Sequence, residues 1–399
     1  MSDGHIHVAL RVRPLLEREE ESGEHAAVEV VPAGAARQEP FVRVLRPVEG
    51  HGVGAAARPR GATLRGAQVQ VQEFEFDCCL GPAVPQEALF DRLDIGAYCD
   101  DALVEGKAAT VMCFGQTGSG KTFTMSGRTL GEAEVLAQQQ EGDGAADVRL
   151  VSEDGLQYRA VRYMARRLRE AQGVDGATVQ LRASYMELYN ETINDLLQGS
   201  SGLKCRWAAV SKQFFVEGLM LVECECEEDL LLVLREGQAN RQRSCHMLNA
   251  DSSRSHVLFT MYAETHRADG PTRYGKITFV DLAGSECLKD TGSDVRETRS
   301  INQSLFALGN VLERLSELQR LRLRGGADAD MKDSTKKKKN AHVDYRSSVL
   351  TQLLMDSLDG NCRTLMVACA TPSSRFVDES LRTIHYAQRT RSITAAPAQ

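Results

Sequence analysis

Hydrophobic and polar residues alternate along several short segments of this chain. The alternation covers residues 6–12, 179–186 and 276–280, and in the first of these it stops at Arg13-Pro14. Alternation with a period of two is typical of half-buried strands. Residues 109–114 form a short, mostly apolar run instead, as expected of a strand buried on both faces. These patterns predict four strands.

Two longer segments carry their leucines at helical spacing. In residues 228–240 these are Leu230, Leu231 and Leu234. Residues 300–321 place five apolar residues on one side, at steps of three and four: Ile301, Leu305, Leu308, Leu312 and Leu315. Such steps predict amphipathic helices whose leucines belong to the core. Strands that alternate with helices predict an α/β domain with a central sheet.

Three stretches lack either pattern. Residues 32–68 are rich in Gly, Ala, Arg and Pro, which predicts loop with a weak hairpin. Residues 128–147 are rich in Glu, Gln, Gly and Ala and are expected to be a surface insertion. Residues 325–330 interrupt the second helix, and four consecutive lysines follow at 336–339. A run of like charges is usually a solvated loop.

Composition narrows the class of protein. The chain has 399 residues, 42% of them hydrophobic, and a formal net charge of -7. This length alone would suggest two or three domains. The net charge excludes a generally basic protein, so attraction to an acidic partner would have to come from local patches.

Cysteine usage and the N-terminal segment bear on the compartment. The eleven cysteines are an odd number and include no C-x-x-C pair, so they indicate neither a zinc site nor a disulfide framework. Reduced thiols in the core are the preferred interpretation. The N-terminus carries no apolar signal segment, and no run approaches the roughly 18 apolar residues that span a bilayer. We therefore expect a cytosolic protein.

The segment after the apolar run has the composition of a phosphate-binding loop. Residues 115–122 read GQTGSGKT and fit the pattern G-x-x-x-x-G-K-[ST]. Its glycines allow backbone N–H groups to close around a phosphate, and the helix that begins near Lys121 points its positive end at the same charge. Lys121 adds a point charge for the phosphates, and the Thr122 hydroxyl suits a magnesium ion. A chance match of eight residues directly after a strand is improbable.

Two further motifs accompany this loop. Residues 249–256 read NADSSRSH, and residues 281–286 read DLAGSE directly after a predicted strand. Together with the loop they resemble switch I and switch II of the kinesin motor domain. Singly, residues 251–253 could be a capping turn and Arg254 with Glu286 a surface ion pair. Their joint occurrence in this order favours the resemblance.

Other motifs of the kinesin motor domain occur in the same order, from residue 11 to about 393. They are residues 11–14 (RVRP), 184–191 (SYMELYNE), 301–310 (INQSLFALGN), 345–351, 356–361 and 379–389. The resemblance implies an α/β fold, a three-layer P-loop NTPase-type kinesin motor domain with a central mixed β-sheet flanked by helices. One domain would then cover residues 1–393, with residues 394–399 similar to the start of a neck linker, and the length-based expectation of several domains fails.

The resemblance also implies a nucleotide site for ATP and Mg2+. The residues that correspond to ATP contacts are Arg11, Arg13, Pro14, Gly115, Gln116, Thr117, Gly118, Ser119, Gly120, Lys121, Thr122 and Phe123. Magnesium would be held by Thr122, Ser253 and, through water, Asp281. The residues with catalytic roles would be Asn249, Ser252, Ser253, Arg254, Gly284 and Glu286.

The family pattern assigns a role to each of these switch residues. Ser252 and Asn249 would order the γ-phosphate and the attacking water. Gly284 would offer its amide to the γ-phosphate. Arg254 and Glu286 would form a salt bridge between the two switches, and loss of the γ-phosphate would release switch II with the helix that follows it.

Microtubules are the partner that the resemblance implies. Lys336, Lys337, Lys338, Lys339 and Arg346 correspond to the surface that faces the acidic filament. The lysine run is similar to that of a kinesin branch used for cargo transport. In the loop after switch II, Cys287 stands where an arginine is common, and the segment to residue 300 is a few residues shorter than usual.

The resemblance therefore implies a microtubule-stimulated motor ATPase in the cytoplasm, associated with the cytoskeleton and directed toward the plus end. One alternative is a nucleotide-regulated protein that binds or destabilises microtubules without stepping. The altered loop favours it slightly, and the intact switch residues Ser252, Ser253, Arg254 and Glu286 argue against it. A GTPase switch is a second alternative. The chain lacks an N-K-x-D guanine motif and has the adenine-side residues 11–14, which argue against it.

Overall fold

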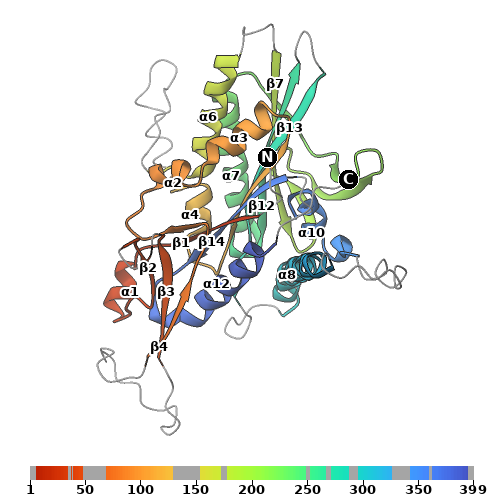
Figure 1. Ribbon diagram of the computed structural model, residues 1–399. Helices are drawn as coiled ribbons and strands as arrows, with labels where there is room; N and C mark the ends of the chain where they lie inside the picture. The colour runs from red at the N-terminus through yellow and green to blue at the C-terminus, as the bar shows by residue number, and fades with distance from the viewer. Residues whose placement is uncertain are drawn as a thin grey trace, which may run out of the picture.

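The computed structural model describes residues 6–34, 37, 39–47, 69–128, 153–171, 178–248, 252–266, 271–286, 295–325, 342–358 and 362–393. The expected surface insertion lies almost wholly outside these residues, as do the four lysines at 336–339 and the tail at 394–399. Figure 1 shows strands in the middle of the molecule and helices on both sides of them.

A mixed sheet of eleven strands forms the centre, in the order β10-β9-β8-β7-β12-β13-β6-β14-β1-β5, with β11 paired to β7. The pairs β13–β6, β6–β14, β14–β1 and β1–β5 are parallel, and the other pairs are antiparallel. The strands are β1 (His7–Val12), β5 (Cys78–Leu80), β6 (Ala108–Phe114), β7 (Thr178–Tyr189), β8 (Thr192–Asp195), β9 (Ser201–Ala208), β10 (Gln213–Glu217), β11 (Val222–Cys224), β12 (His256–His266), β13 (Arg273–Asp281) and β14 (Cys362–Ala370).

A second, smaller sheet joins β2 (Val28–Val31), β3 (Phe41–Pro47) and β4 (Val69–Phe74) in antiparallel pairs. Two of these strands border the low-hydrophobicity stretch for which the sequence predicted only a weak hairpin, and β3 lies inside it. Val42 and Val44 are buried with the half-buried Arg43 between them, and Val28 is buried beside the exposed Glu29. The pattern of period two was therefore present, but over too few residues to stand out.

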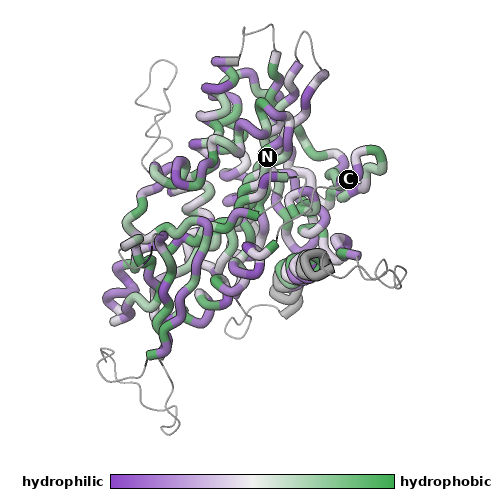
Figure 2. The backbone as a smooth tube through the Cα atoms, in the orientation of Figure 1, coloured by the Kyte–Doolittle hydropathy of each residue, from purple (hydrophilic) through white to green (hydrophobic). Residues whose placement is uncertain are grey.

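Helices cover both faces of the central sheet. The helical elements are α1 (Glu17–Glu21), α2 (Gln86–Arg92), α3 (Ile95–Leu103), α4 (Lys121–Met125), α6 (Leu156–Ala171), α7 (Glu227–Leu248), η1 (Ser252–Arg254), α8 (Val295–Gly325), η3 (Tyr345–Ser347), α10 (Val349–Leu353), α11 (Met355–Leu358), η4 (Ser374–Phe376) and α12 (Val377–Arg391). The helices predicted at 228–240 and 300–321 are confirmed as α7 and α8, and both are longer than predicted. The alternation of apolar and polar residues along these elements can be followed in Figure 2.

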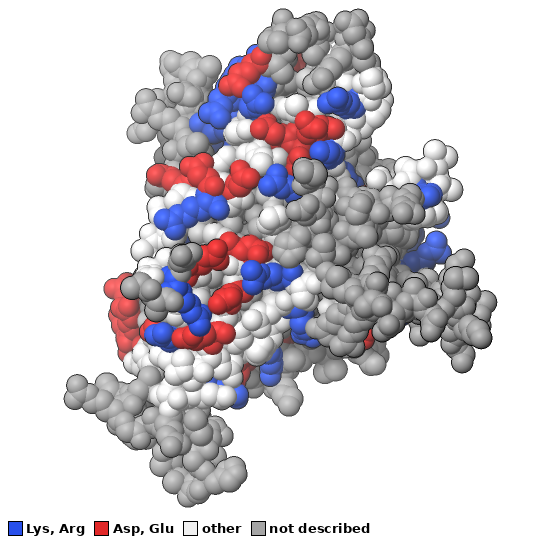
Figure 3. Space-filling model, viewed as in Figure 1, with Lys and Arg blue, Asp and Glu red and all other residues white. Residues whose placement is uncertain are grey.

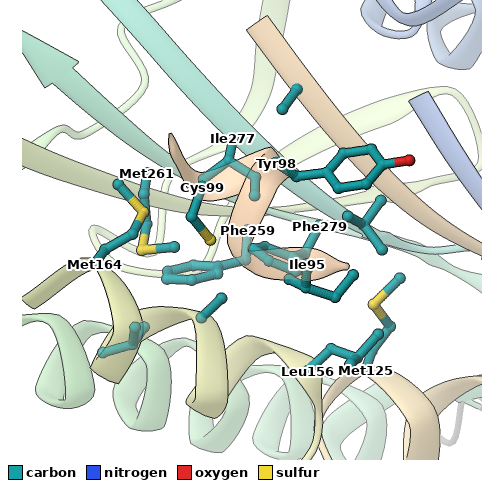
Figure 4. Packing of buried hydrophobic residues seen from close by; sticks show 14 of the residues in the cluster. Ile95, Tyr98, Cys99, Met125, Leu156, Met164, Phe259, Met261, Ile277 and Phe279 are labelled. Carbon is teal, nitrogen blue, oxygen red and sulfur yellow. The ribbon is translucent and has the colours of Figure 1, made fainter. Parts of the chain in front are cut away.

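One buried cluster lies between the sheet and the helices α2, α3, α6 and α7. Figure 4 shows part of it, in which the aromatic rings of β12 and β13 meet side chains from α3, α4 and α6. Phe259 is fully buried and lies between Tyr185 and Phe279, with ring centroids 5.6 Å and 6.4 Å away. Burial of apolar side chains such as these is the main favourable contribution to folding.

A second buried cluster lies on the opposite face, under α8, α10 and α12. Leu305, Leu308 and Leu312 of α8 belong to it, which confirms that the leucine side of this helix is core. Phe114, at the end of β6, stacks on Tyr386 of α12 with ring centroids 4.1 Å apart. The three-layer α/β arrangement predicted from the sequence is confirmed. Among the described residues, no helix has the length and apolar content to traverse a membrane.

Candidate nucleotide site

The phosphate loop connects β6 to α4, at the carboxyl edge of the parallel strands. Gly115 has a φ of +151°, and a Cβ at this position would lie 2.2 Å from the carbonyl oxygen of Cys369. Gly118 and Gly120 have φ values of +76° and +98°. Only glycine adopts such angles without strain, so the loop can turn back on the strand in this way only with these residues.

The loop is held together by its own polar groups. The carbonyl oxygen of Gln116 accepts hydrogen bonds from Ser119 Oγ at 2.7 Å and from Lys121 Nζ at 2.9 Å. Lys121 is only 7% exposed. A phosphate chain seated in the loop would compete with the Gln116 carbonyl for this ammonium, and a charged acceptor forms the stronger hydrogen bond. Lys121 is thus a buried ammonium held within the loop, and its contact with a phosphate stays a prediction.

A buried carboxylate lies beside the loop. Asp281, at the end of β13, is 3% exposed, and its Oδ2 accepts hydrogen bonds from Thr122 Oγ1 at 2.7 Å and Arg241 Nη1 at 3.1 Å. Burial acts to lower the pKa of Arg241, but Asp281, together with Tyr185 and Glu187, raises the pKa overall. Sequence reasoning missed Arg241, because it is one of several arginines on α7.

The same carboxylate fits the expected magnesium ion. The other oxygen of Asp281, Oδ1, is buried and has no hydrogen-bond partner. Magnesium prefers oxygen ligands and usually binds one or two carboxylates or hydroxyls together with substrate phosphates and water. A carboxylate with one unpaired oxygen next to the Thr122 hydroxyl is such a donor set. Within the described part of the chain, no group of three His, Cys, Asp or Glu side chains could hold a metal by itself.

The expected adenine side is built from β1 and the turn that follows it. Arg11 is buried, donates a hydrogen bond to Thr124 Oγ1 at 2.7 Å and lies 5.5 Å from the ring centroid of Phe123. Burial lowers the pKa of Arg11. The Phe123 ring is 40% exposed, which leaves a face on which a base could stack. Arg11 thus contacts α4 on its buried side, through Thr124.

Arg13 connects this turn to the phosphate loop. Its Nε donates to the Gly118 carbonyl oxygen at 2.7 Å, and its Nη1 donates to the Pro14 carbonyl oxygen at 2.7 Å. Both oxygens of Glu19 accept hydrogen bonds from the same guanidinium, at 2.8 Å and 2.5 Å. The hydrogen bond from Arg13 lowers the pKa of Glu19. Such bidentate pairs fix orientation as well as charge.

Sequence reasoning missed Glu19 because it belongs to a run of acidic residues that reads as a solvated surface. Glu19 is 6% exposed although the neighbouring Glu20 is exposed. One local signal was available. Glu19 stands three residues after Leu16 and accepts a hydrogen bond from its backbone N–H at 2.9 Å, as a helix-capping glutamate does.

The two switch segments meet at the phosphate loop. The Gly284 N–H donates to the Ser253 carbonyl oxygen at 2.8 Å, and the Ser285 N–H donates to the Gly115 carbonyl oxygen at 3.1 Å. The Glu286 carboxylate accepts from the Thr117 N–H at 2.8 Å and also from the Thr117 hydroxyl. Switch II is therefore bonded along its backbone to switch I on one side and to the phosphate loop on the other.

Two predicted roles differ from these contacts. The Gly284 amide was expected to serve the γ-phosphate, and here it bonds to Ser253. Glu286 was expected to pair with Arg254, and here both of its carboxylate oxygens bond to Thr117. The expected roles stay predictions for another state of the nucleotide cycle. In that state the Gly284 amide would have to leave Ser253, and the Glu286 carboxylate would have to leave Thr117.

The remaining predicted site residues divide into three groups. Asn249 lies outside the described residues, as do Lys336, Lys337, Lys338 and Lys339, and the side chain of Ser252 is not described. Arg346 is exposed on η3, next to α8 and α10 and apart from the nucleotide site. Its backbone N–H donates to Asp344 Oδ1 at 3.1 Å.

Comparisons with known proteins identify the family of this chain. The sequence profile described as "Kinesin motor domain" matches residues 11–393. The chain is 37% identical over 81% of its length to mouse (Mus musculus) kinesin-like protein KIF12, covering 47% of that relative. It is 33% identical over 98% of its length to chicken (Gallus gallus) kinesin-like protein KIF18B, covering 43% of that relative. The chain thus spans less than half the length of these curated relatives.

A solved structure titled as that of a fast kinesin superposes with a TM-score of 0.75 at 27% sequence identity. The superposition covers 100% of this chain and 94% of the other. Its title refers to an ATPase mechanism and to interactions with microtubules, which are properties of that protein. The profile, the relatives and the shared fold together show that this chain belongs to the kinesin motor domain family, a family of ATPases.

Proposed function

We propose that this chain hydrolyses Mg-ATP and couples hydrolysis to movement along microtubules. The observation that supports the coupling best is the junction of three loops, at which switch II bonds to Ser253 of switch I and to Gly115 and Thr117 of the phosphate loop. A change at the phosphates would therefore reach both switches at once. Nucleotide-driven order and disorder of such loops is a common basis of molecular switching.

The nucleotide would be held by the phosphate loop, with Lys121 on the phosphates and the Phe123 ring beside the base. A magnesium ion bound by Thr122, Ser253 and, through water, Asp281 would neutralise part of the phosphate charge. Phosphoryl transfer needs charge stabilisation and an aligned water more than covalent help from the protein. Ser252 and Asn249 would order that water.

Switch II would report the γ-phosphate by exchanging partners. The Gly284 N–H would leave the Ser253 carbonyl for the γ-phosphate, and Glu286 would leave Thr117 for Arg254. Each exchange replaces existing hydrogen bonds by new ones, so its net free energy would be small and the loop could switch in both directions. Release of phosphate would restore the contacts with Ser253 and Thr117.

The filament contact would come from Lys336, Lys337, Lys338, Lys339 and Arg346. The chain has a net charge of -7, and the face in Figure 3 intersperses acidic and basic side chains over its described part. Attraction to an acidic filament would therefore depend on this local group, and at physiological salt it would act only within about 8 Å. Cytoplasmic, microtubule-associated localisation and plus-end direction follow by family analogy.

The decisive test is the steady-state ATPase rate against the concentration of polymerised tubulin. We expect a saturable rise, and Lys121→Ala should abolish turnover because it removes the phosphate contact. A flat response with filament binding retained would support the alternative of a non-stepping, nucleotide-regulated binding or destabilising protein. Turnover retained in Lys121→Ala would contradict the assignment of the phosphate loop.

The filament contact is tested separately. Replacement of Lys336, Lys337, Lys338 and Lys339 by alanine should weaken co-sedimentation with microtubules at low salt and leave turnover without tubulin intact. Lys107→Ala is the matched control, because Lys107 is exposed and pairs with Glu105 at 3.6 Å. Unchanged microtubule binding in the lysine variant would mean that residues 336–339 are a solvated charge run without a role in the filament contact.

A further inference from the structure

His256 is a buried side chain of the switch region to which neither the motif nor the proposed chemistry gives a role. It is the first residue of β12, two positions after η1, and is 2% exposed. The Ala283 N–H of switch II donates to its Nδ1 at 3.1 Å. Its Nε2 lies 2.8 Å from Ser304 Oγ of α8. One imidazole therefore contacts three elements: the strand after switch I, the switch II loop and the long helix.

The bond from Ala283 determines where the imidazole proton lies. A nitrogen that accepts a hydrogen bond carries no proton, so the ring proton is on Nε2 and is donated to Ser304. Burial, with the positive charges of Lys121 and Arg241 nearby, lowers the pKa of His256 to about 3. The ring stays neutral across the physiological range, and both nitrogens have a partner. His256 is therefore poorly suited to act as a general base.

The position of Ala283 within switch II makes this bond informative. Asp281 is paired with Cys113 of β6, and the Leu282 N–H donates to the Cys113 carbonyl oxygen at 3.2 Å, so both residues are fixed to the sheet. Ala283 is the first residue beyond them, and its N–H bonds to His256. Gly284 follows directly. A displacement of Gly284 toward a γ-phosphate would pull on the peptide that the imidazole holds.

The other end of the ring reaches the helix that the proposed function requires to move. Ser304 is 3% exposed and lies in the buried face of α8, next to Leu305. An imidazole that is hydrogen-bonded through both of its nitrogens is a rigid spacer, because the ring has no internal rotation. The distance between the switch II peptide and the Ser304 hydroxyl is thereby fixed by the ring.

We propose that His256 is the positioning residue that couples switch II to α8, through its bonds to Ala283 and Ser304. This inference rests on the proposed motor function. The chemistry at the phosphates does not use His256, so its loss should uncouple the helix without removing nucleotide hydrolysis. Arg254 and Glu286 would respond to the nucleotide, and His256 would carry that response to the helix.

Two substitutions remove the link from opposite ends. His256→Asn retains an acceptor near the position of Nδ1 but is too short to reach Ser304, and Ser304→Ala removes the acceptor on α8. We expect either change to lower the tubulin-stimulated rate by about fivefold to tenfold, the effect of one lost hydrogen bond. The KM for ATP and the rate without tubulin should stay within about twofold.

The double variant separates coupling from a general loss of stability. If both residues act through one bond, His256→Asn with Ser304→Ala should be no slower than either single variant. Ser380→Ala is the matched control, since Ser380 is a fully buried serine that donates to the Thr371 carbonyl oxygen at 3.0 Å, away from the switches. This control should lose stability and keep tubulin stimulation. Additive losses in the double variant would overturn the proposal.

A reporter on α8 tests the link without filaments, so that failure of the motor function and failure of this inference can be told apart. Phe306 is 70% exposed on α8, and Phe306→Trp in a Trp207→Phe background gives the helix the only tryptophan of the chain. We expect ATP to change its fluorescence, and Ser304→Ala to reduce that change at least about fivefold while ATP still binds. An equal change with and without Ser304, or no change in the reporter itself, would overturn the proposal.

Discussion

The stability of the folded chain should fall on mild acidification because His256 is buried as a neutral ring. An imidazole in an unfolded chain has a pKa of about 6.5. In the folded chain its pKa is lowered to about 3, by burial first and then by Lys121 and Arg241. Between these values the unfolded state binds the proton and the folded state does not, so the free energy of unfolding rises with pH. The contribution is fully present above about pH 6.5 and is lost as the pH falls toward 3.

The magnitude follows from the size of the shift. Each pH unit below about 6.5 costs about 1.4 kcal/mol, so the step from pH 7 to pH 5 should cost about 2 kcal/mol through His256 alone. Carboxylates titrate over part of the same range, and a variant without the imidazole removes their contribution from the comparison. The difference in free energy of unfolding between the wild type and His256→Asn should therefore shrink by about 2 kcal/mol over this step.

Urea denaturation at pH 5, 6 and 7 measures this difference, provided that the slope of free energy against urea is shared. Ser304→Ala is the control, because it loses the hydrogen bond but keeps the imidazole. It should be less stable than the wild type at every pH and should keep the wild-type pH dependence. Parallel curves of the free energy of unfolding against pH for the wild type and His256→Asn would refute the reasoning. They would mean that the imidazole has the same pKa in the folded and the unfolded state.

Three further predictions concern the nucleotide site and the core. Glu19→Gln should raise the Kd for ATP about tenfold with little loss of stability, since it weakens the hold on Arg13, and a fluorescent ATP analogue measures this against Glu20→Gln as the exposed control. Gly115→Ala should abolish ATP binding or folding, because the added Cβ would lie 2.2 Å from a backbone carbonyl oxygen of β14, and calorimetry with circular dichroism separates the two. Phe259→Ala should lower the free energy of unfolding by about 3–5 kcal/mol in urea titrations, and a loss under about 1 kcal/mol would contradict the packing described for this ring.

Much of the fold was readable from local pattern. The strand before the phosphate loop, the loop itself and the start of α4 at Lys121 follow from an apolar run, three glycines and a lysine. The leucine side of α8 was equally clear, because apolar residues recur at steps of three and four from 301 to 315. Only a weak hairpin was predicted where β2, β3 and β4 form a sheet, since the strands are short and β2 and β4 border a stretch rich in glycine and alanine that contains β3.

Residues for the candidate site could be proposed from the sequence, but most of their contacts could not. The identity of Asp281 and Thr122 follows from the motifs, but the Arg241 that holds Asp281 comes from a helix with no local mark of that role. Glu19 stands in an acidic run, and its burial depends on the distant Gly118 loop that Arg13 reaches. The partner of Glu286 was not readable from the motif, because the family pattern pairs it with Arg254 whereas its carboxylate bonds to Thr117 here.

The central claim is that this site drives movement, and a filament-gliding assay with polarity-marked microtubules tests it most directly. The chain is attached to a surface through its C-terminal end and supplied with Mg-ATP. The account predicts gliding that stops when ATP is removed and is absent in Lys121→Ala, with a polarity that assigns the direction. Microtubules that bind and shorten, or bind and stay still while ATP is consumed, would contradict it.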